Sequence, residues 1–210
     1  IDSVPLTAIA FFMLTGELMT SATITDRLVA LSRALIGRIR GGLAQVNVLV
    51  SMFFAGMNGS VVADTATVGA LVLPAMKKAG YPAAFSAAVT GVSSTIGGII
   101  PPSIMMIVLA NSTEISIAAL FAAGIIPGIL IGVVIMIINH YFAIKYNFER
   151  SDEPFSIRRA GKELYRSSFA LLIPLVLVGS VMGGVASVVE AGAITAVSYT
   201  HLTLPTNSLV

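Results

Sequence analysis

The sequence predicts an all-α, polytopic membrane protein built around a helical hairpin and a broken helix. Of its 210 residues, 56% are hydrophobic and only 10% are charged, against about 25% charged residues in soluble domains. The charges gather in short clusters between long apolar stretches, the pattern of a chain that crosses the bilayer several times. Two polar, glycine-bearing interruptions, at residues 56–60 and 95–103, fall within one apolar region. These three observations argue against a single soluble domain.

Composition also limits the function classes. The net charge of +2 is too small to indicate nucleic-acid binding, and the basic residues lie in loops where membrane topology explains them. The chain has no cysteine, so a disulfide framework and a thiolate metal site are excluded. Ile1 opens directly into an apolar segment without a recognisable signal peptide, and we expect the chain to be a piece of a longer protein.

Residues 1–40 are predicted to hold a first span, over residues 5–19, and a basic amphipathic helix over residues 21–40. In the second segment, aliphatic side chains share one helical stripe and arginines lie elsewhere around the helix. The stripe consists of Ile24, Leu28, Leu31, Leu35 and Ile39, and the arginines are Arg27, Arg33, Arg38 and Arg40. A helix lying in the membrane interface and a short cytoplasmic connector explain this pattern equally well.

Residues 41–114 contain both interruptions, the first of them between two apolar segments. Residues 41–57 and 60–76 are 17 residues each, or about 26 Å of helix at a rise of about 1.5 Å per residue. Because a bilayer core is about 30 Å thick, this length fits a re-entrant hairpin or two short spans. The polar tip favours the hairpin, which is predicted to end in a Gly-Tyr-Pro turn at residues 80–82.

A broken helix is expected to follow the hairpin. Residues 83–95 are rich in Ala, Ser, Thr and Gly, the composition of close helix packing in membranes. A Gly-Gly-Ile-Ile-Pro-Pro sequence at residues 97–102 interrupts the helix, because proline lacks an N–H group and leaves a carbonyl one turn earlier unpartnered. A short helix over residues 103–110 and a polar loop over residues 111–114 complete this part.

Residues 115–197 are predicted to hold further spans. One covers residues 115–146 and is expected to kink at Pro127. Another covers residues 168–189. A charged cytoplasmic loop, residues 145–167, separates the two spans.

Residues 198–210 depart from this pattern. They begin Ser-Tyr-Thr-His-Leu-Thr-Leu-Pro-Thr-Asn, with neither a span nor an amphipathic period. The string resembles translated sequencing-adapter sequence, so we expect a non-native tail and assign no function to His201.

The basic clusters agree with one membrane topology. If residues 21–40 are cytoplasmic, a hairpin that returns to its own side also places Lys77 and Lys78 in the cytoplasm. The broken helix then crosses the membrane, residues 111–114 lie outside, and the next span returns residues 145–167 to the cytoplasm. Every basic cluster is then cytoplasmic, as the positive-inside rule requires. Two full spans in place of the hairpin give the same result.

The two interruptions form the candidate functional site. Unwound backbone at membrane depth is tolerated only where protein buries it or where it lines a wet cavity, and broken helices mark binding sites in transporters. A sodium ion takes several oxygen ligands, which freed carbonyls and helix C-terminal ends supply. A kinked helix pair without a ligand is the alternative, but two polar interruptions close in sequence favour an ion site. The residues expected to line an ion or substrate site are Gly56, Gly59, Ser60, Asp64, Thr95, Gly98 and Pro101.

Asp64 is the single charged residue between residues 41 and 76. An ionisable side chain at membrane depth suggests a function. Asp64 also follows the first interruption by one helical turn, where it would cap the helix start and interact favourably with its positive end. Both roles remain open from the sequence.

An ordered series of motifs gives the chain a family resemblance. The motifs are Phe11-Phe12-Met13-Leu14-Thr15-Gly16-Glu17-Leu18-Met19, Gly41-Gly42-Leu43-Ala44-Gln45-Val46-Asn47-Val48, Ser51-Met52-Phe53-Phe54-Ala55-Gly56, Ala63-Asp64, Leu73-Pro74-Ala75-Met76 and Thr95-Ile96-Gly97 through Pro101-Pro102-Ser103. Together they resemble the large membrane subunit of tripartite ATP-independent periplasmic (TRAP) transporters, the DctM-like permeases. The resemblance covers about residues 5–197, roughly the first half of such a subunit.

The resemblance implies one half of an inverted-repeat, elevator-type transporter in the bacterial inner membrane. It implies sodium-driven import of an organic acid: a C4-dicarboxylate, a sialate or a sugar acid. The implied partners are a small membrane subunit of the same transporter and a periplasmic binding protein that delivers the substrate. Sodium is the coupling ion, and no other cofactor is implied.

The family's first sodium site corresponds to Asn58, Gly97, Ile99 and Pro102, mainly through backbone carbonyls. Serine is common in the family where this chain has Asn58, which leaves the role of that side chain open. The family's second hairpin would follow residue 197, so the chain alone is not expected to transport.

Two rivals from other classes are a passive channel and a membrane-embedded enzyme. An enzyme would need a nucleophile or an acid–base pair within the membrane, where only Asp64 is available. A channel would need rings of polar residues from repeated subunits. Sodium-dependent uptake would separate a carrier from both.

Overall fold

The computed structural model describes residues 4–20, 24–37, 39–148 and 156–203. These residues form helices and no strand, which confirms the all-α prediction. In chain order the helices are α1 (Val4–Thr20), α2 (Ile24–Ile36), α3 (Gly42–Asn58), α4 (Val61–Lys78), α5 (Ala83–Ser94), the 3-10 helix η1 (Thr95–Gly98), α6 (Ile104–Thr113), α7 (Ile117–Lys145), α8 (Ile157–Met182) and α9 (Val188–Thr203).

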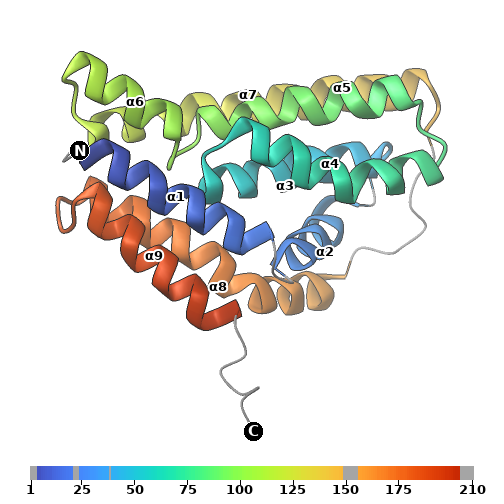
Figure 1. The fold of residues 1–210 in the computed structure, drawn as a ribbon. Coiled ribbons are helices and arrows are strands. Elements are labelled where there is room, and N and C mark those ends of the chain that lie inside the picture. Colours follow the sequence, from blue (N-terminus) through green and yellow to red (C-terminus); the bar gives the residue numbers. More distant parts are fainter. Residues whose placement is uncertain (1–3, 21–23, 38, 149–155, 204–210) are drawn as a thin grey trace, which may run out of the picture.

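Helix α3 lies at the centre of the molecule. It contacts α1, α2, α4, α5, η1, α7 and α8, and its fully buried Val46 and Phe54 belong to the main hydrophobic core. Figure 1 shows the α3–α4 pair between α5 and α7 on one side and α1, α8 and α9 on the other. A second core joins α1, α6, α7, α8 and α9, and its large members are Phe12, Ile107, Phe121 and Leu177.

Helix α7 is, among the described residues, the one helix long and apolar enough by itself to cross a membrane. Only 28% of its most apolar stretch is buried, and Ile126, Leu130 and Ile137 are exposed. A core helix of a soluble protein would be mostly buried, so this outward apolar face fits a lipid-facing helix. The helix runs unbroken through Pro127, so the expected kink does not interrupt it.

Helix α8 is a second candidate span if its two halves, Ile157–Ser168 and Ala170–Met182, which are bent by 57° relative to each other, are taken as one. The predicted span over residues 168–189 is wrong at its C-terminal end. Gly184 has a φ angle of +67°, and the Val185 N–H donates to the Ser180 carbonyl at 2.9 Å. This left-handed turn ends α8 at Met182 and lets α9 run back along it.

The predicted polar loop over residues 111–114 is wrong for most of its length. Residues 111–113 continue α6, because the hydroxyls of Ser112 and Thr113 donate to backbone carbonyls four residues earlier, at 3.0 and 2.7 Å. Polar residues therefore do not end this helix. It ends at Glu114, whose φ angle is +58°.

The predicted loop over residues 145–167 is also helical from Ile157 onward. Ser156 begins α8, because its Oγ accepts a hydrogen bond from the Arg159 N–H at 3.4 Å and so caps the first turn. Residues 149–155 lie outside the described part of the chain.

Helix α2 packs against α3 and α8. Leu28 and Leu31 are fully buried, whereas Leu35 and Ile39, at the end of the same stripe, are exposed. The basic amphipathic helix predicted over residues 21–40 is thus present from Ile24 to Ile36. Residues 21–23 and Arg38 lie outside the described residues.

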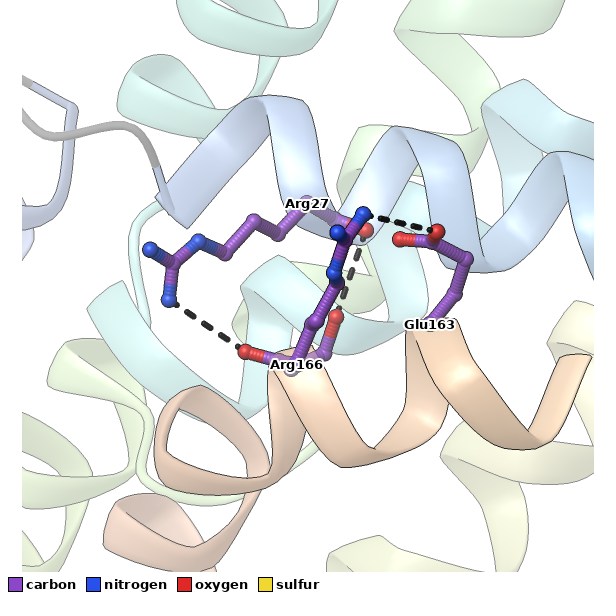
Figure 2. A network of polar contacts seen from close by, with 4 residues as sticks. Arg27, Glu163 and Arg166 are labelled. Carbon is purple, nitrogen blue, oxygen red and sulfur yellow. Dashed lines mark hydrogen bonds and ion pairs between the residues drawn. The ribbon is translucent and has the colours of Figure 1, made fainter. Parts of the chain in front are cut away.

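Polar contacts link α2 to the bend of α8. Figure 2 shows Arg27 pointing to the backbone carbonyl of Arg166, with 3.3 Å between Nη1 and the oxygen. The Arg166 guanidinium in turn pairs with Glu163 at 3.3 Å. The Ser167 hydroxyl donates to the Arg27 carbonyl at 3.3 Å. These contacts hold α2 beside α8 where α8 changes direction.

Helix α9 extends further than the sequence predicts. Residues 198–203, assigned to the tail, continue this helix, while residues 204–210 lie outside the described residues. At its start the Ser187 N–H donates to Glu190 Oε2 at 2.8 Å, and the Glu190 N–H donates to Ser187 Oγ at 3.3 Å. This reciprocal capping box fixes where α9 begins.

Candidate functional site

The first interruption is the tip of a helical hairpin. Gly59 has left-handed backbone angles (φ 59°, ψ 16°) and Ser60 has extended ones (φ −122°, ψ 116°), so α4 runs back along α3. Ser60 Oγ accepts from the Ala63 N–H at 3.3 Å and caps α4. Asn58 Oδ1 accepts from the Ser60 N–H at 3.1 Å and tightens the turn. The two helices therefore form an antiparallel hairpin, an arrangement that fits both a re-entrant pair and two short spans.

The second interruption breaks an otherwise continuous helical path from α5 to α6. After Ser94 the chain tightens into η1, and the Ile96 carbonyl accepts hydrogen bonds from the N–H groups of both Ile99 and Ile100 at 2.9 Å. The backbone then leaves the helix, and the Pro101–Pro102 peptide bond is cis. The predicted broken helix is confirmed.

Ser103 closes the break, a role that the sequence analysis did not assign. Its hydroxyl donates to the Gly98 carbonyl at 2.8 Å, and its Oγ accepts from the Met106 N–H at 3.4 Å. One side chain thus satisfies a carbonyl freed by the break and caps α6. The sequence did contain a signal for this role, because a serine directly before an apolar run is typical of the start of a helix.

The tip and the break pack directly against each other. The Ile104 N–H donates to the Gly59 carbonyl at 3.2 Å. A Cβ atom at Gly59 would overlap the Pro102 carbonyl. A Cβ atom at Gly97 would lie 3.5–3.6 Å from backbone atoms of Ser60 and Val61, which is ordinary contact. The two interruptions therefore form one cluster of non-helical backbone, which we call the tip–break cluster.

The tip–break cluster contains some of the unpartnered backbone oxygens that a hard cation needs as ligands. None of the hydrogen bonds among the described residues ends on the carbonyls of Gly97, Ile99 or Pro102. Gly97 and Pro102 lie at the tip, whereas a Cβ atom at Gly124 of α7 would overlap the Ile99 carbonyl oxygen. Ile99 thus directs its carbonyl toward α7. Asn58 is 2% exposed, and its Nδ2 has no partner among the described residues.

Most of the residues predicted to line the site belong to the cluster. Beyond Gly59 and Ser60, a Cβ atom at Gly56 would lie 3.9 Å from the Pro101 carbonyl oxygen, and one at Gly98 would lie 3.4 Å from a methyl of Val61. Thr95 lies apart. Its side chain is exposed, and its hydroxyl donates back to the Val92 carbonyl at 2.7 Å.

Behind the tip, a ladder of buried polar side chains joins α3 to α5. Asn47 Nδ2 donates to Thr90 Oγ1 at 2.7 Å, and the Ser93 hydroxyl donates to Asn47 Oδ1 at 3.2 Å. Ser93 Oγ also lies 3.2 Å from Ser51 Oγ. Sequence reasoning took the hydroxyls of α5 as packing alone. Polar residues spaced four apart on both helices (47 and 51, 86 and 90) were the signal for a ladder.

Asp64 lies beside this ladder and is fully buried. Its two carboxylate oxygens accept no hydrogen bond from the described residues, and the hydroxyls of Ser51 and Ser94 face it. Ser60 supplies the side-chain cap of α4, and Asp64 lies in the first turn of that helix, where its charge interacts favourably with the positive end. Asp64 is also the one charged side chain that is buried within the described residues.

Three glycines spaced four apart on α7 pack closely, two against the break and one against α3, and the sequence analysis missed them. A Cβ atom on Gly124 would overlap the Met106 side chain and the Ile99 carbonyl. One on Gly128 would overlap the Ile100 side chain, and one on Gly132 would overlap the Met52 side chain. Small residues at this spacing let apolar helices approach closely, which is the signal that could have found them. Helix α7 is thus shaped to the break on one face and apolar on the other.

A hairpin whose tip packs on a broken helix, next to a helix with an outward apolar face, is an arrangement also found at the binding sites of membrane transporters. The chain belongs to the family described as "Tripartite ATP-independent periplasmic transporter, DctM component", whose model matches residues 1–206. This confirms the family resemblance seen in the sequence.

Curated relatives are similar over most of the chain. The sialic acid TRAP transporter permease protein SiaT of Haemophilus influenzae is 39% identical over 200 residues, which is 95% of this chain and 32% of that protein. The C4-dicarboxylate TRAP transporter large permease protein DctM of Pseudomonas aeruginosa is 37% identical over 192 residues (91% and 45%). The 2,3-diketo-L-gulonate TRAP transporter large permease protein YiaN of Escherichia coli is 37% identical over 195 residues (93% and 46%). The chain therefore spans less than half the length of these relatives.

Proposed function

We propose that this chain forms the first half of the large permease of a sodium-coupled importer of an organic acid. Family membership supports a permease, and the relatives' names refer to sialic acid, a C4-dicarboxylate and 2,3-diketo-L-gulonate, which are all organic acids. Those relatives are transporter permeases and not enzymes, so we propose no catalytic residue. The remaining half of the permease would supply the second hairpin of an inverted repeat, with elevator-type movement.

The observation that carries the proposal is the direct contact between the hairpin tip and the break. The Pro102 carbonyl oxygen lies there beside Gly59, Gly97 packs on Ser60, and neither carbonyl accepts a hydrogen bond from the described residues. In a membrane each such group costs several kcal/mol if it stays unsatisfied. A sodium ion supplies positive charge for these oxygens, with Asn58 Oδ1 as a further ligand, and couples its own gradient to substrate movement.

The proposed partners are a small membrane subunit and a periplasmic binding protein that delivers the organic acid. The words "tripartite" and "periplasmic" in the family description support them. We place the protein in the bacterial inner membrane as a multi-pass permease. The exposed apolar face of α7 supports contact with the lipid bilayer.

Sodium-dependent uptake tests the proposed function. The full-length permease that carries this chain is reconstituted in vesicles with its small subunit, and the loaded binding protein is added outside. Uptake of the labelled acid is expected to require an inward sodium gradient and to stop when a potassium gradient replaces it. Uptake at the same rate in both gradients would point to a passive channel.

The topology of the described residues can be tested separately. The rings of Tyr81 and Phe148 lie 4.4 Å apart, so the ends of α4 and α7 meet at one end of the molecule. Since α7 has 29 residues, or about 44 Å at the helical rise, Ser112 near its start lies at the other end. We propose that the end bearing Lys77, Lys78 and Lys145 is cytoplasmic.

Single cysteines at Lys78 and at Ser112 would be labelled from outside with a membrane-impermeant reagent in intact cells. The chain has no native cysteine, so no background thiol of its own reacts. Labelling is expected at position 112 and not at position 78. The reverse pattern would overturn the proposed orientation, and equal labelling of both positions would overturn the separation of the two ends.

A further inference from the structure

The Asp64 carboxylate lies in a setting that neither the fold nor the tip–break cluster accounts for. It is fully buried, and neither of its oxygens has a hydrogen-bond partner among the described residues. It lies one turn into α4, on the side where α4 meets α3 and α5. Buried charges in proteins are normally paired or hydrogen-bonded, because desolvating an unpaired charge is costly. Something must therefore compensate this carboxylate.

The ladder fixes where each hydroxyl proton points. Thr90 Oγ1 donates to the Ser86 carbonyl at 3.0 Å, so it must accept from Asn47 Nδ2. That orientation turns Asn47 Oδ1 toward Ser93, which donates to it. A hydroxyl has one proton. Ser51 is therefore the donor in the Ser51–Ser93 pair.

The same count applies to Ser94, whose hydroxyl donates to the Thr90 carbonyl at 2.8 Å. Ser51 and Ser94 thus each have an acceptor other than Asp64 for their one proton. Both hydroxyls lie next to the carboxylate, whose oxygens accept no hydrogen bond from them. Three oxygen-bearing side chains therefore lie together around a buried carboxylate that has no hydrogen bond, and a positive charge between them would stabilise its ionised form.

No protein cation supplies that charge within the described residues. The elements packed against Asp64 bring hydroxyls and an amide from α3 and α5. The basic residues of α4 are Lys77 and Lys78, which are exposed at its far end. Asp64 forms no ion pair with any described residue.

We propose that Asp64, Ser51 and Ser94 bind a monovalent metal cation, sodium under transport conditions, at a site separate from the tip–break cluster. A single carboxylate is neutralised by one positive charge, whereas a divalent ion would leave a buried excess charge. Carboxylate and hydroxyl oxygens are the ligands that hard cations prefer. The inference rests on the proposed sodium coupling and adds a second ion per chain.

Sodium binding to the full-length permease, purified in lipid nanodiscs without substrate, tests the proposal. Bound ²²Na⁺ is counted at saturation for the wild type, Asp64→Asn, Ser94→Ala and the control Ser86→Ala. Asp64→Asn is expected to lower the count by one ion per chain and to remain folded, because the amide can donate to the lone pairs of Ser51 and Ser94. Ser94→Ala is expected to keep the count and weaken the affinity several-fold.

Ser86 is the matched control because it is a buried serine of α5 whose hydroxyl donates only to its own helix, at the Pro82 carbonyl. Its replacement is expected to change neither count nor affinity. An unchanged count in Asp64→Asn would overturn the proposal, and loss of one bound proton in its place would show that the carboxyl is protonated. A wild type that binds no sodium would overturn the proposed function itself.

Discussion

Replacing Gly59 by alanine is expected to raise the sodium concentration for half-maximal uptake at least tenfold in the full-length permease. Gly59 has a φ angle of +59°, and a non-glycine residue in this left-handed region costs about 1 to 2 kcal/mol. The added Cβ atom would also overlap the Pro102 carbonyl. About 1.4 kcal/mol corresponds to a tenfold change in affinity. The steric overlap adds to this strain and separates the tip from the break.

The matched control is Gly91→Ala in α5, where a Cβ atom meets nothing within 4 Å. It also gains helix propensity, so its uptake and its sodium dependence are expected to match the wild type. Both variants are compared for membrane insertion and for assembly with the small subunit before uptake is measured. A Gly59→Ala permease that is assembled and keeps the wild-type sodium dependence would show that the tip–break contact does not determine ion binding.

The hairpin and the break could be predicted because glycine and proline act locally. The Gly59-Ser60 tip needs a positive φ angle and a helix cap, and the Pro-Pro pair removes N–H donors, so both features can be read from a few adjacent residues. That the tip and the break meet could be inferred only from family resemblance. Contacts such as the Ile104–Gly59 hydrogen bond join residues 45 positions apart and leave no local pattern.

Other features depend on partners that the sequence pattern does not show. The apolar run after Ser168 looks like one span, but a single left-handed turn at Gly184 divides it into α8 and α9. A hydropathy value is an average over a window of many residues, so it does not reveal a turn made by a single glycine. The Asn47–Ser93 ladder is likewise a product of pairing between helices, because each of its polar residues taken alone is equally compatible with simple packing.

Replacing Gly97 is the second change expected to alter the sodium dependence of uptake strongly, and the size of the effect is expected to depend on the side chain introduced. Gly97 begins the Gly-Gly-Ile-Ile-Pro-Pro sequence of the break, but it is not among the glycines with a positive φ angle. A Cβ atom there would lie 3.5–3.6 Å from the Ser60 and Val61 backbone. Alanine is therefore expected to fit and to leave the sodium dependence of uptake close to that of the wild type.

Valine at position 97 is expected to raise the sodium concentration for half-maximal uptake by about tenfold or more, as a change of about 1.4 kcal/mol would produce. Its two γ-methyl groups are held in few rotamers and extend beyond a Cβ atom that already touches the tip. They would press on the Ser60 backbone and widen the gap between the carbonyls of the proposed ion site. Gly97→Ala and Gly97→Val share the same backbone constraint, so the pair isolates the effect of crowding. Equal sodium dependence in both variants, with normal assembly, would mean that the ion does not lie between Gly97 and the hairpin tip.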